Sequence, residues 1–170
     1  GNVFSYGSAL YDLESIEVLM GPQGHRFGKV SSGGVINLRT QRPGDAQKNK
    51  ATVSFGSFSS QSYQLSSSGP LQDNLSYVLA LRKAQSDGFL KNASGRDNDS
   101  ESLNGRLSFF WDGGEGTKAS FGVSFDDHEL GAQPVVSRNQ AGFYARSTDY
   151  DEFTEIDRDQ QYLTIERELD

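Results

Sequence analysis

The stretch Asp12-Leu13-Glu14-Ser15-Ile16-Glu17-Val18-Leu19-Met20-Gly21-Pro22-Gln23-Gly24 contains a short strand followed by a turn. Between Ile16 and Met20 every second residue is apolar, which is the period of a strand with one buried face. Gly21-Pro22 ends this strand, because proline fixes φ and glycine permits positive φ. A second strand is predicted over Val35–Thr40, and Pro43 stops it. The first 43 residues therefore predict two short strands around a glycine-rich turn.

Beyond Pro43 the pattern changes to longer alternating segments. Apolar and polar residues alternate in residues 51–55, 63–65, 75–82, 103–111, 118–125 and 160–169. The turns at 72–74 and 113–116 are short, whereas the connections 87–101 and 126–157 are long; the tight link at 57–60 is an exception. The pattern predicts an all-β chain, an antiparallel meander of about six strands. Short turns at one end and long loops at the other are typical of outer-membrane barrels, although a one-sided soluble sheet alternates in the same way.

Composition excludes several classes of protein. The 170 residues contain no cysteine and two histidines, so neither disulfides nor a thiolate metal site is expected. The net charge is −7, and residues 126–170 alone carry −8, which disfavours nucleic acid as a partner. No apolar stretch approaches the roughly 20 residues of a membrane-spanning helix, and no signal peptide is recognised at the start. Barrel strands need only about 10 alternating residues, so the composition does not exclude a membrane β-barrel.

The opening stretch also resembles a known family. Together with Phe27-Gly28, Ser32-Gly33-Gly34-Val35-Ile36-Asn37-Leu38 and Arg42-Pro43, it is similar to the end of the plug domain in TonB-dependent outer-membrane receptors. Ser68-Gly69-Pro70-Leu71 and Ser86-Asp87-Gly88-Phe89 look like early barrel strands of that family. The resemblance implies that residues 1–43 are the C-terminal part of the plug, a small remnant, and that residues 44–170 are the first strands of an incomplete transmembrane β-barrel.

The resemblance implies a function in nutrient uptake across the outer membrane of a Gram-negative bacterium. Such a receptor binds a ferric siderophore, haem, cobalamin or a glycan outside the cell, and the inner-membrane partner TonB pulls on the plug. TonB would act through a region that precedes Gly1. The implied partners are therefore TonB, outer-membrane lipid and a nutrient ligand. The pattern identifies neither the ligand nor a ligand-binding residue.

The departures from the family pattern concern how the plug is held. Met20 stands where the family usually has an arginine that pairs with barrel carboxylates, so that lock is expected to be weakened. Gly24-His25-Arg26-Phe27-Gly28 is more basic than usual, and Arg26 is a candidate to compensate. Arg39 and Arg42 are the residues we predict to form plug-to-barrel ion pairs.

Other clusters of acidic residues and glycines are better explained as loops and turns than as metal, catalytic or phosphate sites. Asp97, Asp99 and Glu101 alternate like calcium ligands, but the glycine that a tight calcium loop needs is absent. Asp126-Asp127-His128-Glu129 has no recognisable nucleophile beside it. Gly33-Gly34 lacks the Lys-Ser/Thr ending of a phosphate-binding loop. We therefore predict no catalytic residue, no metal site and no cofactor.

Two alternatives stay open at this point. A soluble all-β carbohydrate-binding or adhesin module would explain the strand alternation and would use Trp111 as a sugar platform. An enzyme is less favoured, because no nucleophile–base or acid–base pair stands at usable spacing. Six strands cannot close around a plug, so an isolated piece would have two open sheet edges and is predicted to dimerise through them.

Overall fold

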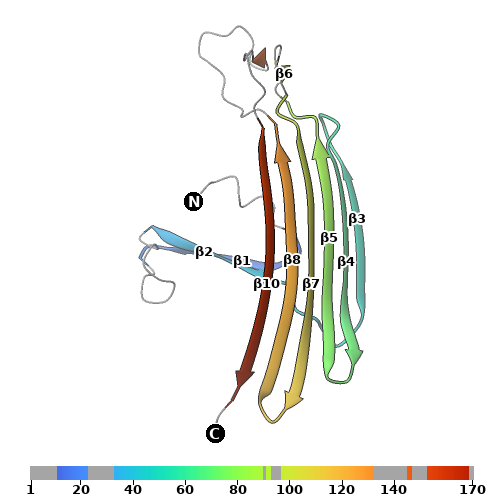
Figure 1. Ribbon diagram of the computed structural model, residues 1–170, viewed down its shortest axis with the longest axis vertical. Helices are drawn as coiled ribbons and strands as arrows, with labels where there is room; N and C mark the ends of the chain where they lie inside the picture. The colour runs from blue at the N-terminus through green and yellow to red at the C-terminus, as the bar shows by residue number, and fades with distance from the viewer. Residues whose placement is uncertain are drawn as a thin grey trace.

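A curved six-stranded antiparallel sheet is the largest part of the computed structural model (Figure 1). The structure describes residues 11–22, 33–89, 91–92, 97–131, 145–146 and 153–168. The strands of the sheet are β3 (Lys48–Phe55), β4 (Gln61–Gln72), β5 (Leu75–Ser86), β7 (Ser100–Gly114), β8 (Thr117–Leu130) and β10 (Thr154–Arg167). Their order is β10-β8-β7-β5-β4-β3, so strands that follow one another in sequence are neighbours. The predicted all-β antiparallel meander is confirmed.

Tight turns close the lower end of the sheet in Figure 1. β4 passes to β5 through Asp73-Asn74, and β7 passes to β8 through Glu115-Gly116. Gly114, Glu115 and Gly116 all have positive φ, a conformation that glycine adopts without a steric penalty. Both turns lie where the sequence predicts them. At the upper end, β3 and β4 are joined by a tight link in which Phe58 and Ser59 have positive φ.

The upper strand ends extend further than the alternation suggested. β8 continues to Leu130, although irregular structure was expected from Asp126, and β10 begins at Thr154 and not near Gln160. The extra residues are mainly charged and form a regular ladder from Asp126↔Arg158 to Leu130↔Thr154. Backbone pairing therefore continues past the point where apolar alternation stops, because the ladder needs no apolar side chain. A parallel pair joins β6 (Lys91–Asn92) to β9 (Ala145–Arg146).

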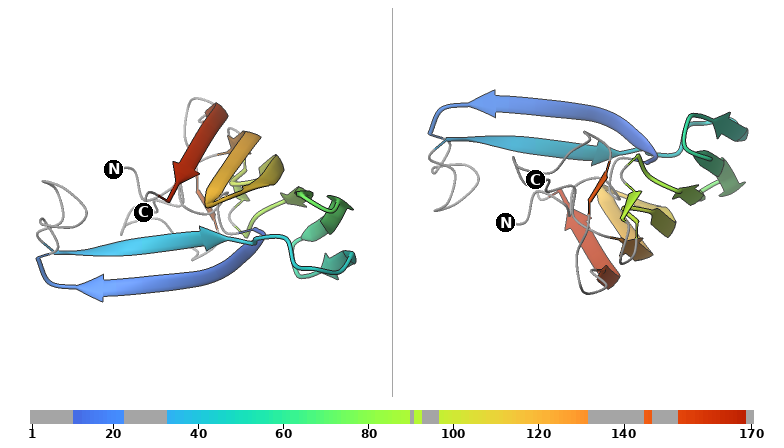
Figure 2. Two further views of the ribbon diagram at one scale, coloured as in Figure 1. Left: turned by 90° about the horizontal axis from the view of Figure 1, so that it is seen from below. Right: turned by 90° about the horizontal axis from the view of Figure 1, so that it is seen from above.

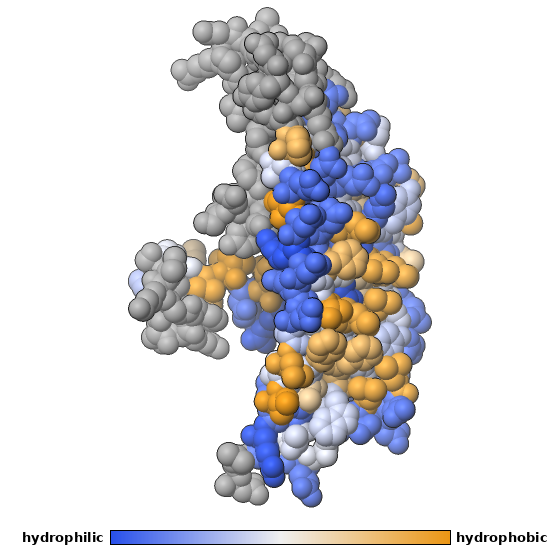
Figure 3. Space-filling model, in the orientation of Figure 1, coloured by the Kyte–Doolittle hydropathy of each residue, from blue (hydrophilic) through white to orange (hydrophobic). Residues whose placement is uncertain are grey.

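The two faces of the sheet differ in chemistry. The concave face carries small or polar residues, and Ser102, Asn104 and Ser108 are buried there together with Val78 and Ala80. The convex face carries exposed apolar side chains: Val53, Phe55, Leu65, Leu81, Leu103, Trp111, Phe121, Val123, Phe125, Leu163 and Ile165. Figure 3 shows apolar side chains gathered over the middle of the sheet on this side. The sheet is thus apolar on the outside of its curve and polar on the inside.

A separate two-stranded hairpin lies on the concave side. β1 (Leu13–Met20) pairs with β2 (Gly34–Thr40) in antiparallel register from Leu13↔Thr40 to Met20↔Gly34. Figure 2 shows the hairpin running across the strands of the sheet and projecting away from it. Gly34 has a φ of +142°, and a Cβ there would lie 2.6 Å from the Leu19 carbonyl oxygen, so this position requires glycine. The two strands predicted for residues 1–43 are confirmed.

Candidate functional site

The base of the hairpin is attached to the concave wall of the sheet by an ion pair. Arg106 on β7 donates a short hydrogen bond from Nη2 to the Asp12 carboxylate, and the same nitrogen lies 3.0 Å from the Asp12 carbonyl oxygen. Only 14% of the Arg106 side chain and 2% of the Asp12 side chain are exposed. The Asp12 carbonyl also accepts from the Gln41 amide at 3.2 Å, so the entry and exit of the hairpin meet at one point. We call Tyr11, Asp12, Asn104, Arg106 and Asp126 the anchor cluster.

Tyr11 covers this ion pair from the side. Its ring centroid lies 5.8 Å from the guanidinium carbon of Arg106, within the range of a cation–π contact, and the residue is buried. Burial, with a smaller contribution from the negative charge of Asp126, raises the pKa of Tyr11 to about 12, and the charge of Arg106 opposes this rise. Tyr11 is therefore neutral at any physiological pH and serves as an apolar lid over the guanidinium.

Two opposing effects act on the Asp12 carboxyl, namely loss of solvation on burial and attraction to Arg106. Burial raises the pKa of the Asp12 carboxyl above its ordinary value, and the hydrogen bond and charge of Arg106 lower it by less. Desolvation of a buried ion pair commonly offsets most of its Coulombic attraction, whereas loss of one partner leaves the other uncompensated. Asp12 also has a φ of +56°, which aspartate tolerates better than most residues. The pair thus specifies where the hairpin sits more than it stabilises the whole molecule.

The wall beside the ion pair is polar and closely connected. Asn104 is fully buried and donates from Nδ2 to the Asp126 carboxylate at 3.0 Å, while its Oδ1 atom has no partner within the described part of the chain. Arg106 is opposite Ser124 in the register of β7 and β8, so Asp126 occupies the diagonal position. Diagonal Cα atoms on a sheet face are roughly 7–8 Å apart, within reach of an arginine side chain. Two carboxylates, Asp12 and Asp126, therefore flank Arg106.

Neither arginine predicted for plug-to-barrel pairing belongs to this cluster. Arg39 pairs with Glu17 across the hairpin at 3.3 Å, and Asn37 donates to the same carboxylate at 2.9 Å. Both side chains of that pair are about half exposed, so solvent screens it. Arg42 lies where the chain leaves the hairpin for β3, and it lines a cavity of about 480 Å³. The structure places the two arginines at different sites and does not bring them together.

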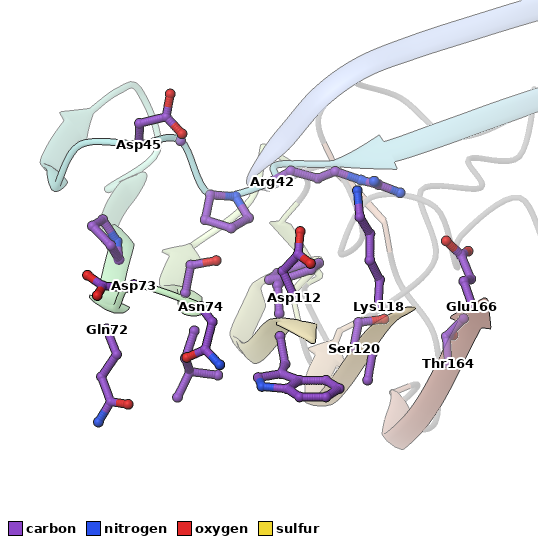
Figure 4. Close-up of a pocket in the computed structure, with 18 residues that line it drawn as sticks. Arg42, Asp45, Gln72, Asp73, Asn74, Asp112, Lys118, Ser120, Thr164 and Glu166 are labelled. Carbon is purple, nitrogen blue, oxygen red and sulfur yellow. The ribbon is translucent and has the colours of Figure 1, made fainter. Parts of the chain in front are cut away.

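The cavity beside Arg42 contains a row of charges on the lower wall. Asp112, Lys118 and Glu166 are neighbours in register across β7, β8 and β10. Figure 4 shows the Arg42 side chain extending along the cavity toward Lys118 and Glu166. Among the described residues, no carboxylate lies within 4.0 Å of the Arg42 guanidinium. This arrangement places Arg42 opposite the wall without a closed ion pair.

The remaining sequence candidates have no role in the anchor cluster. Met20 is 86% exposed near the far end of the hairpin, and the weaker lock expected there stays a prediction. The segment 24–28 with Arg26 lies outside the described residues, as does most of the loop 126–157 beyond residue 131. No group of three metal-ligating side chains occurs in the part of the chain that the structure describes. Among the same residues there is no helix long and apolar enough to cross a membrane.

Sequence reasoning missed Tyr11, Asp12 and Arg106. Asp12 stands at the start of the quoted motif, and Arg106 lies in the polar face of its strand. The alternation placed Arg106 only on the face opposite the apolar one, together with Asn104 and Ser108. Ninety-four residues separate Arg106 from Asp12, and no local pattern reports such a pairing.

Comparison with known proteins confirms the resemblance to TonB-dependent receptors. The curved antiparallel sheet and the hairpin on its inner side match the fold of the ferric yersiniabactin uptake receptor FyuA from Yersinia pestis, with a TM-score of 0.82 and 24% identity. That match covers 94% of this chain and 26% of FyuA. No family model matches the chain.

Relatives in sequence are receptors as well. A pesticin receptor of Yersinia pestis is 37% identical over 91 residues, which cover 52% of this chain and 14% of the relative. The ferric enterobactin receptor PirA of Pseudomonas aeruginosa is 34% identical over 103 residues, 56% of this chain and 14% of the relative. The chain thus resembles a segment of a TonB-dependent receptor and spans a small part of these relatives. The prediction that it is not an enzyme agrees with the names of these relatives, which are receptors.

Proposed function

We propose that this chain is part of an outer-membrane receptor that takes up a ferric siderophore. Residues 1–43 would be the end of its plug and residues 44–170 the first strands of its barrel. The observation that carries this proposal is the pair of opposed faces. Exposed apolar side chains on the convex face suit contact with lipid, and a polar concave face suits a barrel interior that holds a plug.

The length of the apolar band supports a membrane-spanning barrel. Its lower limit follows one register row from Ile165 on β10 through Ala119 and Trp111 to Leu75 on β5. On β7 the band extends from Leu103 to Trp111, which is nine residues. A strand that crosses a bilayer needs about 9–11 residues, so the band is long enough.

The hairpin would be the plug element nearest the barrel wall. The anchor cluster fixes its base, and Arg42 remains our candidate for a second ion pair with the wall, formed with Glu166 or Asp112 when the cavity narrows. Arg39 already has a partner inside the hairpin, so a plug-to-barrel role would require it to exchange Glu17 for a wall carboxylate. The open edges β3 and β10 would pair with further barrel strands. Dimerisation of isolated copies through these edges stays a prediction.

The ligand class and the partners rest on the relatives. Two of them are named for ferric siderophores, enterobactin and yersiniabactin, which favours a ferric siderophore over haem or cobalamin for this receptor. TonB would be the energy-transducing partner, and lipid of the Gram-negative outer membrane would cover the convex face. A soluble carbohydrate-binding module is less favoured, because Trp111 lies within the apolar band, next to Leu75 in register.

Site-directed spin labelling of the complete receptor in lipid bilayers tests the lipid-facing band. Labels at Leu81→Cys and Phe121→Cys should collide with oxygen, which concentrates in lipid, and be protected from a water-soluble nickel chelate. The matched label at Ser66→Cys, on the concave face of β4, should show the reverse or be protected from both. If the convex labels are as accessible to the nickel chelate as those of a soluble protein, the transporter proposal is wrong.

A further inference from the structure

The anchor cluster contains one cation and two carboxylates, although one carboxylate would suffice to hold the hairpin. Arg106 bonds to Asp12 of the hairpin, and Asp126 lies diagonally across the neighbouring strand of the same wall. Asp126 already has a fixed orientation, since Asn104 donates to it at 3.0 Å. The negative charges of Asp126 and Asp12 both raise the pKa of Tyr11, which belongs to the hairpin side. Arg158 on β10 is opposite Asp126 in register, so the second carboxylate lies between two arginines, and its place beside Arg106 calls for an explanation.

We propose that Asp126 becomes the ion-pair partner of Arg106 when the hairpin leaves the wall. The guanidinium then exchanges its ion pair with Asp12 for one with Asp126, and we call this exchange the hand-over. This inference rests on the proposed function, in which the hairpin belongs to a movable plug. Without Asp126, departure of Asp12 and Tyr11 would leave the Arg106 charge with no carboxylate among its register neighbours on the described wall, a costly state. In that register Ala80 and Ser124 are opposite Arg106, and Arg82 lies diagonally. With Asp126 in place, a charge-assisted pair replaces the one that is lost.

The charges of this ion pair are placed the other way round from those of the plug-to-barrel pair that the family usually forms at the position of Met20. There the family pattern places the cation on the plug and the carboxylates on the barrel; here the cation belongs to the wall and the departing group is a carboxylate. A wall that keeps Asp126 beside Arg106 retains a carboxylate next to the guanidinium in either state, on a face that also carries Arg82 and Arg158. Asp12 is then the one charged group of the anchor cluster that leaves with the hairpin, and water solvates its carboxylate well once it is exposed. Asp126 is thus a positioning residue that sets how readily the hairpin opens.

A buried reporter on the wall makes the opening measurable. Ala80 is fully buried on the concave face and is opposite Arg106 in register, and the chain described here contains no cysteine. In the complete receptor, with any other cysteines replaced, the rate of maleimide labelling at Ala80→Cys in isolated outer membranes reports the fraction of open hairpin when opening and closing are fast. Equal resistance of the variants to heat in detergent confirms that the barrel itself is intact.

Asp126→Asn should slow labelling roughly fivefold or more, because the open state loses a charge-assisted partner that the closed state does not use. The amide oxygen that this substitution introduces can still accept the bond from Asn104. Asp127→Asn is the matched control: it removes the same charge from the next residue, which points to the opposite face, and labelling should not change. In an Arg106→Met background whose labelling is still slower than that of a free thiol, Asp126→Asn should have no effect, because the cation that Asp126 would receive is gone.

The outcomes separate this inference from the proposed function. Slower labelling in Asp126→Asn that disappears in the Arg106→Met background supports the hand-over. Unchanged or faster labelling in Asp126→Asn, with a well-protected thiol in the parent receptor, overturns the hand-over and leaves the plug arrangement standing. A thiol at position 80 that reacts as fast as a free thiol in the parent receptor shows that the hairpin does not cover this wall, and both proposals then fail.

Discussion

Arg106 on β7 binds both the carboxylate and the main-chain carbonyl of Asp12, ninety-four residues earlier in the chain. This contact joins the hairpin to the sheet at the point where the hairpin begins, while the covalent chain joins the two at Gln41 and Arg42. Both ends of the hairpin are therefore fixed to one place on the wall. The rest of β1 and β2 projects away from the sheet (Figure 2). Loss of this attachment should therefore free the whole hairpin and leave the sheet in place.

Arg106→Met should weaken the attachment of the hairpin to the wall at neutral pH. Breaking a buried ion pair by removing one partner costs about 3–5 kcal/mol, and we expect the lower end, since the raised pKa of Asp12 lets its carboxyl take up a proton. Arg39→Met is the matched control: its pair with Glu17 is largely exposed, and the expected cost is less than about 1 kcal/mol. Limited proteolysis of the hairpin in the complete receptor measures both. Equal protection of the Arg106→Met variant and the parent would contradict the anchor.

The attachment should weaken at high pH through Tyr11. Its pKa is 10.0 in an unfolded chain and about 12 in the structure, so the neutral ring is favoured in the folded state. A raised pKa gives a contribution that is fully present below pH 10 and is lost as the pH rises through 12. The shift corresponds to less than about 2–3 kcal/mol, because solvent screens this partly buried group. Labelling of Ala80→Cys, corrected for thiol ionisation, should accelerate between pH 10 and 12, and Tyr11→Phe should abolish that acceleration. An unchanged pH profile in Tyr11→Phe would exclude Tyr11 as its cause.

Gly122→Ala should disturb the concave wall next to the anchor cluster, because Gly122 lies diagonally from Arg106 in register. A Cβ at Gly122 would lie 2.3 Å from the ring of Tyr162, so the ring would have to move and lose its hydrogen bond to Ser108 at 3.1 Å. Overpacking of this kind typically costs about 1–3 kcal/mol. Gly44→Ala is the control, because its nearest neighbour is the flexible end of Lys48 at 3.8 Å. Urea unfolding of the two variants in detergent gives the difference; equal midpoints would mean that the ring does not pack on Gly122.

The sequence predicted the repeating part of this molecule and not its long-range contacts. Alternation from Leu75 to Arg82 or from Leu103 to Trp111 is a local property, and a one-residue slip would expose the wrong face, so the strands and their order were recognisable. Strand ends such as Leu130 and Thr154 were missed, because backbone pairing extends into charged residues that carry no alternation. The anchor was missed for a different reason. Arg106 and Asp12 become neighbours only through the complete path of the chain, and neither has an unusual local sequence.

A charge placed on the convex face should distinguish a membrane protein from a soluble one. Leu163 on β10 is 68% exposed, and in water its replacement by lysine would change stability by no more than about 0.5 kcal/mol. If lipid covers this face, Leu163→Lys should instead cost about 1–2 kcal/mol, between the cost at the bilayer middle and that at its surface, because Leu163 lies only two residues from Ile165 at the lower limit of the band. Thr164→Lys is the matched control, since the next residue points to the concave, polar side and should tolerate the charge. The measurement is the free energy of unfolding of the complete receptor in phospholipid bilayers, with the same variants in detergent for comparison. A large cost for Leu163→Lys alone supports lipid contact at this strand, whereas two small and equal costs would argue that the convex face meets water and that the chain is a soluble module.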